Sequence, residues 1–221
     1  MQDETEGNMP AAMIVGIILA AGASSRMGRP KALLPLGGET FVSCVCRTLT
    51  AAGVDDVVVV AGAELEAVTS AVHRAGLSAR IIENPRRDEG QLSSLLAGLA
   101  VADRPGVEAV VVHLVDAPLV AAGTVRAVMD AFRRTRAPVV RPIIHGRHGH
   151  PVLFARGVFD ELRRADPSVG AKAVVRAHAA DACDVPVDDA GACQDIDTPA
   201  DYARFIGGAS YPGFSGSASG T

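Results

Sequence analysis

The chain has 221 residues, of which 48% are hydrophobic and only 4% aromatic, and its formal net charge is -4. This length suits a single α/β domain whose core is built mainly from aliphatic side chains. The small net charge provides no basic footprint for nucleic acid, so no nucleic-acid partner is expected. An anionic substrate would need local Lys and Arg side chains.

Both ends of the chain are expected to lie outside the folded unit. Residues 1–11 are polar and residues 208–221 are rich in Gly and Ser, which predicts disordered tails around one domain at residues 12–207. The apolar run Met13–Ala23 is too short to span a bilayer, and its acidic flank is unlike that of a secretory signal. The cysteines lack metal-site spacing, so reduced thiols, a cytoplasmic location and no membrane contact are predicted.

Short apolar runs alternate with helical patterns along the chain. Unbroken runs at Met13–Leu19, Val57–Val60 and Ala109–Val112 are typical of parallel strands that are buried on both faces. Helical patterns lie between and after them, at residues 41–52, 65–75, 92–102 and 124–134. This order predicts a three-layer α/β fold with a mostly parallel, doubly wound sheet, in which ligands bind beyond the carboxyl ends of the strands.

The first chemical feature is the segment from Leu19 to Lys31, which directly follows the first predicted strand. Its small residues allow the backbone N–H groups to approach a phosphate, and Arg26, Arg29 and Lys31 can neutralise phosphate charge. The segment matches neither the G-x-x-x-x-G-K-[ST] phosphate loop nor the G-x-G-x-x-G dinucleotide fingerprint. A plain turn with solvated basic residues is the alternative interpretation.

Two further segments fall at a predicted strand end or loop. Asn84-Pro85 precedes Gly90-Gln91-Leu92-Ser93-Ser94-Leu95, in which Gly90 allows an unusual backbone angle and two hydroxyls stand at a helix start. A helix cap alone would also explain this pattern. Asp116-Ala117-Pro118 places a carboxylate at the end of a central strand, where it is suited to hold Mg²⁺ between phosphates. An ordinary Asp-Pro turn is the alternative.

The C-terminal half contains two more candidate segments. The run His145–His150 predicts a flexible hairpin with anion-binding groups rather than a metal site, because neither carboxylates nor cysteines are expected nearby. In Asp195-Ile196-Asp197-Thr198-Pro199, strand alternation would place both carboxylates on one face. Thr198 is expected to cap the following helix, with Pro199 at its first position.

The segment Leu-Ala-Ala-Gly-x-Ser-x-Arg-Met-Gly-x-x-Lys resembles the signature of nucleotidyltransferases related to molybdenum cofactor cytidylyltransferase, and the similarity runs from about Ile14 to Phe205. The resemblance implies a Rossmann-like nucleotidyltransferase (nucleotide-diphospho-sugar transferase) fold that transfers CMP from CTP to molybdopterin and releases pyrophosphate. It also implies a molybdenum hydroxylase or its chaperone as a partner.

The same resemblance implies roles for individual residues. Mg²⁺ is expected on Asp116 and Asp197, the α-phosphate on Lys31, and the leaving pyrophosphate on Arg26. Catalysis is accordingly assigned to Lys31, Arg26 and Asp116. The Gly149-His150-Pro151 segment is similar to one that faces the acceptor. The expected nucleotide-binding residues are Leu19, Ala20, Ala21, Gly22, Ser24, Arg26, Lys31, Asn84, Gly90, Ser93 and Ser94.

One segment departs from the family pattern. Relatives often carry Gly-Asp-x-Gly-Ala-Arg, whereas here Ser168 replaces the acidic residue and Lys172 replaces the arginine. This weakens the expectation for the acceptor more than that for the nucleotide. Two alternatives therefore stay open: an NAD(P)H-dependent reductase on the same scaffold, similar to the nicotine blue oxidoreductases and using NADPH, and a cofactor-binding or chaperone module. The pair Asp116 and Asp197 counts against the binding module.

Overall fold

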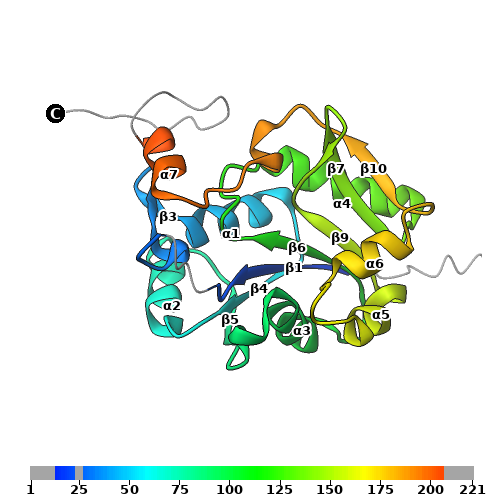
Figure 1. Ribbon diagram of the computed structural model, residues 1–221, viewed down its shortest axis with the longest axis horizontal. Helices are drawn as coiled ribbons and strands as arrows, with labels where there is room; N and C mark the ends of the chain where they lie inside the picture. Colours follow the sequence, from blue (N-terminus) through cyan, green and yellow to red (C-terminus); the bar gives the residue numbers. More distant parts are fainter. Residues whose placement is uncertain (1–12, 23–26, 207–221) are drawn as a thin grey trace, which may run out of the picture.

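The computed structural model describes residues 13–22 and 27–206, so the predictions for both tails and for Ser24 and Arg26 lie outside the described residues. Within these ranges the chain forms an eight-stranded sheet ordered β10-β7-β9-β6-β1-β4-β5, with β8 paired to β7 (Figure 1). The strands are β1 (Met13–Ala20), β4 (Asp56–Ala61), β5 (Arg80–Glu83), β6 (Val107–Leu114), β7 (Val139–Ile144), β8 (Arg147–His148), β9 (Val152–Ala155) and β10 (Cys183–Pro186). A separate hairpin pairs β2 (Pro35–Leu36) with β3 (Glu39–Thr40).

The sheet is mostly parallel, as the sequence predicts. Strands β5, β4, β1 and β6 run parallel to one another, and β10 is parallel to β7. Strand β9 is antiparallel to both β6 and β7, and β8 turns back against β7. The turn between β7 and β8 holds His145 and Gly146 at φ angles of 48° and 77°, which confirms the predicted hairpin.

Helices cover both faces of the sheet (Figure 1). Helices α1 (Phe41–Ala52), α2 (Leu65–Arg74) and α4 (Ala122–Thr135) pack on one face, and α3 (Gln91–Ala102), α5 (Phe159–Arg164) and α6 (Lys172–Ala177) on the other. The valines of β4 explain why its apolar run is unbroken, because Val57 and Val59 enter one core while Val58 and Val60 enter the other. No helix in the described part of the chain is long and apolar enough to cross a membrane.

Local signals set the ends of α1. The Thr40 side chain accepts a hydrogen bond from the backbone N–H of Ser43, and Gly53 ends the helix in the left-handed conformation at φ 87°. Cys44 and Cys46 are buried on this helix, and burial raises the pKa values of their thiols to about 11 and about 12. These two cysteines are therefore core thiols, as the sequence predicts.

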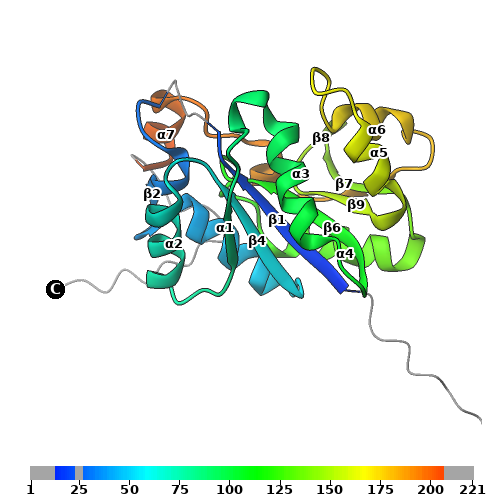
Figure 2. The same ribbon diagram turned by 90° about the horizontal axis from the view of Figure 1, so that it is seen from below.

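The order of the strands fixes where a ligand can bind. The chain passes outward from β1 to β4 and β5, and then returns through α3 to β6 on the other side of β1. This reversal leaves a crevice at the carboxyl ends of β1 and β6, where Leu19 pairs with Leu114. Figure 2 shows β1 and β6 with α3 from the second direction.

Buried His113 in β6 makes stability depend on pH. Its side chain is fully buried, and burial lowers its pKa to about 3, so the folded protein holds it neutral while the unfolded chain protonates it at about pH 6.5. Between these values the unfolded chain binds the extra proton, so stability falls as the pH falls. We expect the slope of unfolding free energy against pH to decrease by about 1.4 kcal/mol per pH unit in His113→Gln. Urea titrations between about pH 4 and pH 6 measure this slope. The variant His73→Gln on α2 should keep the wild-type slope, and an unchanged slope in His113→Gln would contradict the assignment.

Candidate functional site

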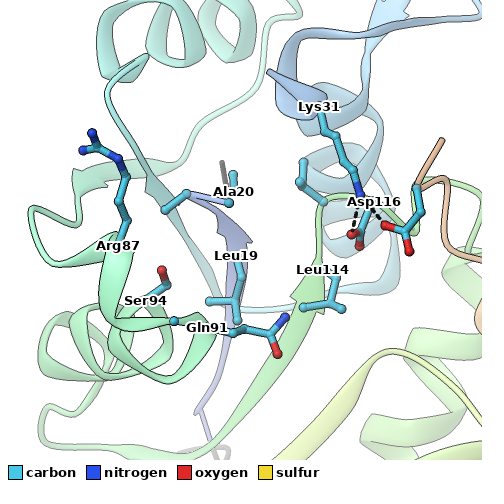
Figure 3. Close-up of a pocket in the computed structure, with 13 residues that line it drawn as sticks. Leu19, Ala20, Lys31, Arg87, Gln91, Ser94, Leu114 and Asp116 are labelled. Atoms are coloured by element: carbon cyan, nitrogen blue, oxygen red, sulfur yellow. Dashed lines mark hydrogen bonds and ion pairs between the residues drawn. The ribbon is translucent and has the colours of Figure 1, made fainter. Parts of the chain in front are cut away.

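A cavity of about 310 Å³ opens at the carboxyl edge of the sheet, where the strand order reverses. Three chain segments form its walls: the end of β1 from Leu19 to Gly22, the end of β6 from Leu114 to Asp116, and the start of α3. In Figure 3, Lys31 and Asp116 lie on one side of the β1 end and Arg87 on the other. The sequence-predicted residues that line the cavity are Leu19, Ala20, Ala21, Gly22, Lys31, Gly90, Ser94, Asp116 and Asp197.

Lys31 joins the two predicted metal ligands. Its Nζ donates to Asp116 Oδ2 at 3.1 Å and to Asp197 Oδ1 at 2.5 Å. Burial alone would lower the pKa of Lys31, yet the hydrogen bonds and charges of Asp197 and Asp116 outweigh it and raise the pKa above 10.5. Lys31 is therefore a protonated cation that neutralises a carboxylate pair at neutral pH.

The backbone brings Asp197 to Asp116 from 81 residues further along the chain. The N–H of Ile196 donates to the carbonyl oxygen of Asp116 at 2.7 Å, and the Ile196 side chain is fully buried. The prediction of a strand here is wrong, because this segment is fixed by that bond and by burial instead of by pairing in the sheet. Asp195 and Asp197 accordingly do not share a face: Asp197 lines the first cavity and Asp195 lines a second one.

The helix that follows, α7 (Pro199–Ile206), begins as the sequence predicts. The Thr198 hydroxyl oxygen accepts from the N–H of Asp201 at 3.1 Å, and the Asp201 carboxylate accepts from the N–H of Thr198 at 3.0 Å. Tyr202 of this helix donates to the carbonyl oxygen of Pro35 and packs against Phe41. These contacts hold the Asp197 segment against the N-terminal third of the chain.

The carboxylate pair fits a divalent cation. Asp116 Oδ1 is buried and has no hydrogen-bond partner among the described residues, which is a costly state for a carboxylate oxygen without a cation. Residues 13–22 and 27–206 contain no cluster of three or more potential metal ligands. Mg²⁺ commonly binds through one or two carboxylates and completes its coordination with substrate phosphates. The pair therefore fits a cation that arrives with a nucleotide.

The opposite wall of the cavity suits an anion. Gly90 stands before α3 at φ 96°, which confirms the expected unusual backbone angle, and the helix begins directly at the cavity with Gln91. A helix start presents backbone N–H groups and partial positive charge to an anion. Ser94 and Arg87 line the same wall. A bound anion would thus lie between the start of α3 and the side chains of Lys31, Asp116 and Asp197.

Asn84 and Ser93, two of the predicted nucleotide contacts, do not line the cavity but hydrogen-bond to each other beside it. Asn84 is buried, and its Nδ2 donates to Ser93 Oγ at 2.8 Å and to Ser94 Oγ at 3.0 Å. Its Oδ1 accepts from the N–H of Arg86. Asn84 therefore ties the end of β5 to the first turn of α3 and orients Ser94, the member of this group that reaches the cavity.

A second cavity, of about 640 Å³, adjoins the first and shares Leu19, Gln91 and Leu114 with it. Its walls come from α3, β9 and α6. They also include Pro167 to Lys172, the segment whose sequence differs from the family pattern. His150, in the segment expected to face the acceptor, also lines it. Burial lowers the pKa of His150, so its imidazole is neutral.

The reason given for dismissing metal-site chemistry at the histidine hairpin is wrong. His148 Nε2 lies 2.9 Å from Asp184 Oδ2, and Cys193 Sγ donates to the carbonyl oxygen of Arg147. Strand β10 pairs with β7 and brings Asp184 there from a distant part of the chain, which sequence neighbours do not reveal. The described residues still hold no cluster of three ligands at the hairpin.

Sequence reasoning missed several cavity residues. Gln91 and Arg87 both line the first cavity. Gln91 lies in the segment that starts at Gly90 but was not predicted as a site residue, and Arg87 stands just before that segment. Arg141 and Asp195 line the second cavity, where Arg141 depends on pairing between strands that the sequence pattern did not predict. Arg87 follows β5, a strand that the sequence pattern did not predict.

Comparison with known proteins agrees with this geometry. The family model described as MobA-like NTP transferase domain matches residues 16–183. The structure is similar to that of Rv0371c from Mycobacterium tuberculosis, with a TM-score of 0.77, 31% identity and coverage of 90% of this chain and 100% of that one. The same protein solved in complex with manganese gives a TM-score of 0.70, 28% identity and coverage of 89% and 100%.

Two curated relatives have different names. Nicotine blue oxidoreductase of Paenarthrobacter nicotinovorans is 36% identical over 160 residues, which cover 69% of this chain and 76% of that protein. A probable molybdenum cofactor guanylyltransferase of Opitutus terrae is 34% identical over 134 residues, which cover 59% and 61%. The second name specifies guanylyl transfer, whereas the sequence predicts cytidylyl transfer. The family match spans most of the chain, and the chain therefore belongs to the MobA-like NTP transferase domain family.

Proposed function

We propose that the protein transfers CMP from CTP to the phosphate of molybdopterin and releases pyrophosphate. The observation that carries the proposal is the partly exposed carboxylate pair bridged by Lys31, with the buried Asp116 Oδ1 left without a partner among the described residues. The larger adjoining cavity leaves room for an acceptor beside the nucleotide.

The chain's own residues contribute alignment and charge. Asp116 and Asp197 would hold the divalent cation, which neutralises phosphate charge when it is bound. Lys31 would move from the carboxylates to the α-phosphate, since a triphosphate and its cation compete for both partners. The start of α3 and Arg87 would hold the nucleotide from the opposite wall. Such a site accelerates transfer by positioning and electrostatic stabilisation.

Isotope transfer tests the proposal. CTP labelled at the α-phosphate is incubated with Mg²⁺, molybdopterin and the protein, and the label should appear in a dinucleotide product. Label that stays in CTP, or appears only in free CMP, would contradict the transfer.

The nucleotide base gives a separate prediction. Ala20 and Ala21 line the cavity, and their side chains also belong to the two hydrophobic cores, so the expectation of a pyrimidine rests on the resemblance to cytidylyltransferases. We expect CTP to bind at least tenfold more tightly than GTP, a difference of about 1.4 kcal/mol. Calorimetric titration with Mg²⁺ measures both affinities, and Ala21→Gly should narrow the ratio. Equal affinities in the wild type would contradict the predicted preference, and reversed affinities would favour GTP as the donor, in line with the name of the Opitutus relative.

A second candidate function is an NAD(P)H-dependent reductase. Its support is the 36% identity to nicotine blue oxidoreductase. The cavity at the sheet reversal also has the position in which doubly wound folds hold dinucleotides. The reductase differs from the transferase in its metal requirement, because hydride transfer from NADPH needs no cation between phosphates.

A further inference from the structure

Arg141 stands out in the second cavity because its guanidinium is largely buried and incompletely bonded. Its side chain is only 14% exposed, and its Nε donates to Asp184 Oδ1 at 2.6 Å. Neither terminal nitrogen, Nη1 or Nη2, makes a hydrogen bond to another residue that the structure describes. Neither terminal nitrogen is among the fully buried atoms that lack a partner, so both reach the open cavity, where a ligand can accept their hydrogen bonds.

Asp184 fixes the direction of this guanidinium. It occupies the register position beside Arg141 in the parallel pair of β10 and β7, and its second oxygen lies 2.9 Å from His148 Nε2. One carboxylate thus holds two side chains of the cavity wall. Because Asp184 takes the Nε of Arg141, the terminal nitrogens of a planar group remain for the cavity.

The charges around Arg141 select the kind of group that it can bind. Asp184 compensates the guanidinium charge at contact distance, while Asp195 and Lys172 add one carboxylate and one ammonium group to the same cavity and offset each other. Arg141 therefore presents two terminal nitrogens, which carry four N–H groups, with little net positive charge. This arrangement suits a neutral hydrogen-bond acceptor, such as a ring carbonyl, better than a second phosphate.

The shape of the cavity limits the ligand further. Its walls include the apolar side chains of Leu92 and Leu95 on α3 and of Val152 and Phe154 on β9. Strand β9 separates β7 from β6, so Arg141 lies about 10 Å across the sheet from β6, the strand that precedes Asp116. A ligand that contacts both Arg141 and the Asp116 end of the site must be long. The apolar walls favour flat rings.

We propose that Arg141, held by Asp184, is a specificity-determining residue that binds the carbonyl edge of a planar heterocycle, at the end of the acceptor remote from its reacting phosphate. The assignment of this ring to the acceptor rests on the proposed function. The inference adds the residue that recognises the ring. It fits molybdopterin, whose ring is a pterin.

Fluorescence titration at about pH 7.5 with two pteridines tests the proposal on the full chain. Pterin carries a carbonyl oxygen at position 4, and 2,4-diaminopteridine replaces it with a donating amino group. We expect the wild type to bind pterin at least tenfold more tightly, since a buried donor facing a donor is left unpaired. Arg141→Met should reduce this preference to less than twofold. The matched control Arg147→Met, an exposed arginine on neighbouring β8, should retain it.

The variant Asp184→Asn tests the positioning role of that carboxylate. The substitution weakens the contact that fixes the Arg141 guanidinium and should reduce the preference for pterin over 2,4-diaminopteridine at least threefold. Circular dichroism checks that each variant is folded. Equal binding of the two probes by the wild type, no binding of either probe, or equal losses in Arg141→Met and Arg147→Met would overturn the inference. Isotope transfer from CTP would persist in those cases if the proposed function holds, so the two claims fail separately.

Discussion

Asp116→Asn is expected to lower the rate of pyrophosphate release by on the order of a hundredfold or more, with little change in the fold. The substitution keeps the size of the side chain but removes the charge that would hold the cation against the phosphates. Asp116 is 23% exposed at the strand end, and its Oδ1 has no hydrogen-bond partner in the described part of the chain. Rates of pyrophosphate release with CTP, molybdopterin and Mg²⁺ measure the effect.

Further variants separate this role from a general charge effect. Asp197→Asn should cause a similar loss, and the double variant should lose less than the sum of the two, because both carboxylates serve one cation. Asp188→Asn removes an exposed carboxylate from the loop that precedes the Asp195 segment and should keep the wild-type rate. Equal rates for Asp116→Asn and Asp188→Asn would contradict the assignment.

Lys31→Met should have two effects of opposite direction. In the structure Lys31 neutralises Asp116 and Asp197, so a cation that enters without a nucleotide must displace it. The variant should therefore bind Mn²⁺ alone about tenfold more tightly, a gain of about 1.4 kcal/mol. Pyrophosphate release should nevertheless fall by on the order of a hundredfold, because the positive charge proposed for the α-phosphate is lost. Electron paramagnetic resonance of free Mn²⁺ measures the affinity.

The chain's other lysine provides the control for metal binding. Lys172→Met removes the same charge from the wall of the second cavity and should leave the Mn²⁺ affinity unchanged. An affinity for Mn²⁺ that is the same in Lys31→Met and in the wild type would show that Lys31 does not compete with the cation.

The central part of the fold could be predicted because its signals are local. An unbroken valine run specifies a strand buried on both faces, and β4 has one valine pair in each core. The ends of α1 follow from Thr40 and Gly53, which satisfy the backbone at each end of the helix. Such patterns depend on residues within one turn or one strand of each other, so the sequence reveals them.

The C-terminal half was less predictable because its features depend on distant pairing. Strand β9 enters the sheet antiparallel between β6 and β7, although its four residues have no pattern that specifies direction. The segment containing Asp195 and Asp197 looks like a strand by alternation, yet a single backbone bond to Asp116 positions it. Asp184 reaches Arg141 and His148 through strand register alone.

The candidate site shows the same difference between features set by local sequence and features set by distant contacts. Asp116, Lys31 and the β1 end were predicted because each stands at or just after a strand that the sequence identifies. The role of Asn84 could not be settled from the sequence, because an amide near a helix start can bind a ligand or the helix itself. Here the buried hydroxyls of Ser93 and Ser94 accept its hydrogen bonds. Burial decides between these uses, and the sequence does not state it.

One paired assay tests the central claim of nucleotidyl transfer most directly. The wild-type protein is given CTP, molybdopterin and Mg²⁺ while pyrophosphate release is followed, and in parallel NADPH and a quinone-like pigment while NADPH oxidation is followed, each with and without EDTA. The carboxylate pair predicts pyrophosphate release that EDTA abolishes, with no NADPH oxidation. A protein that releases no pyrophosphate, yet oxidises NADPH in the presence of EDTA, would contradict the transferase and support the reductase.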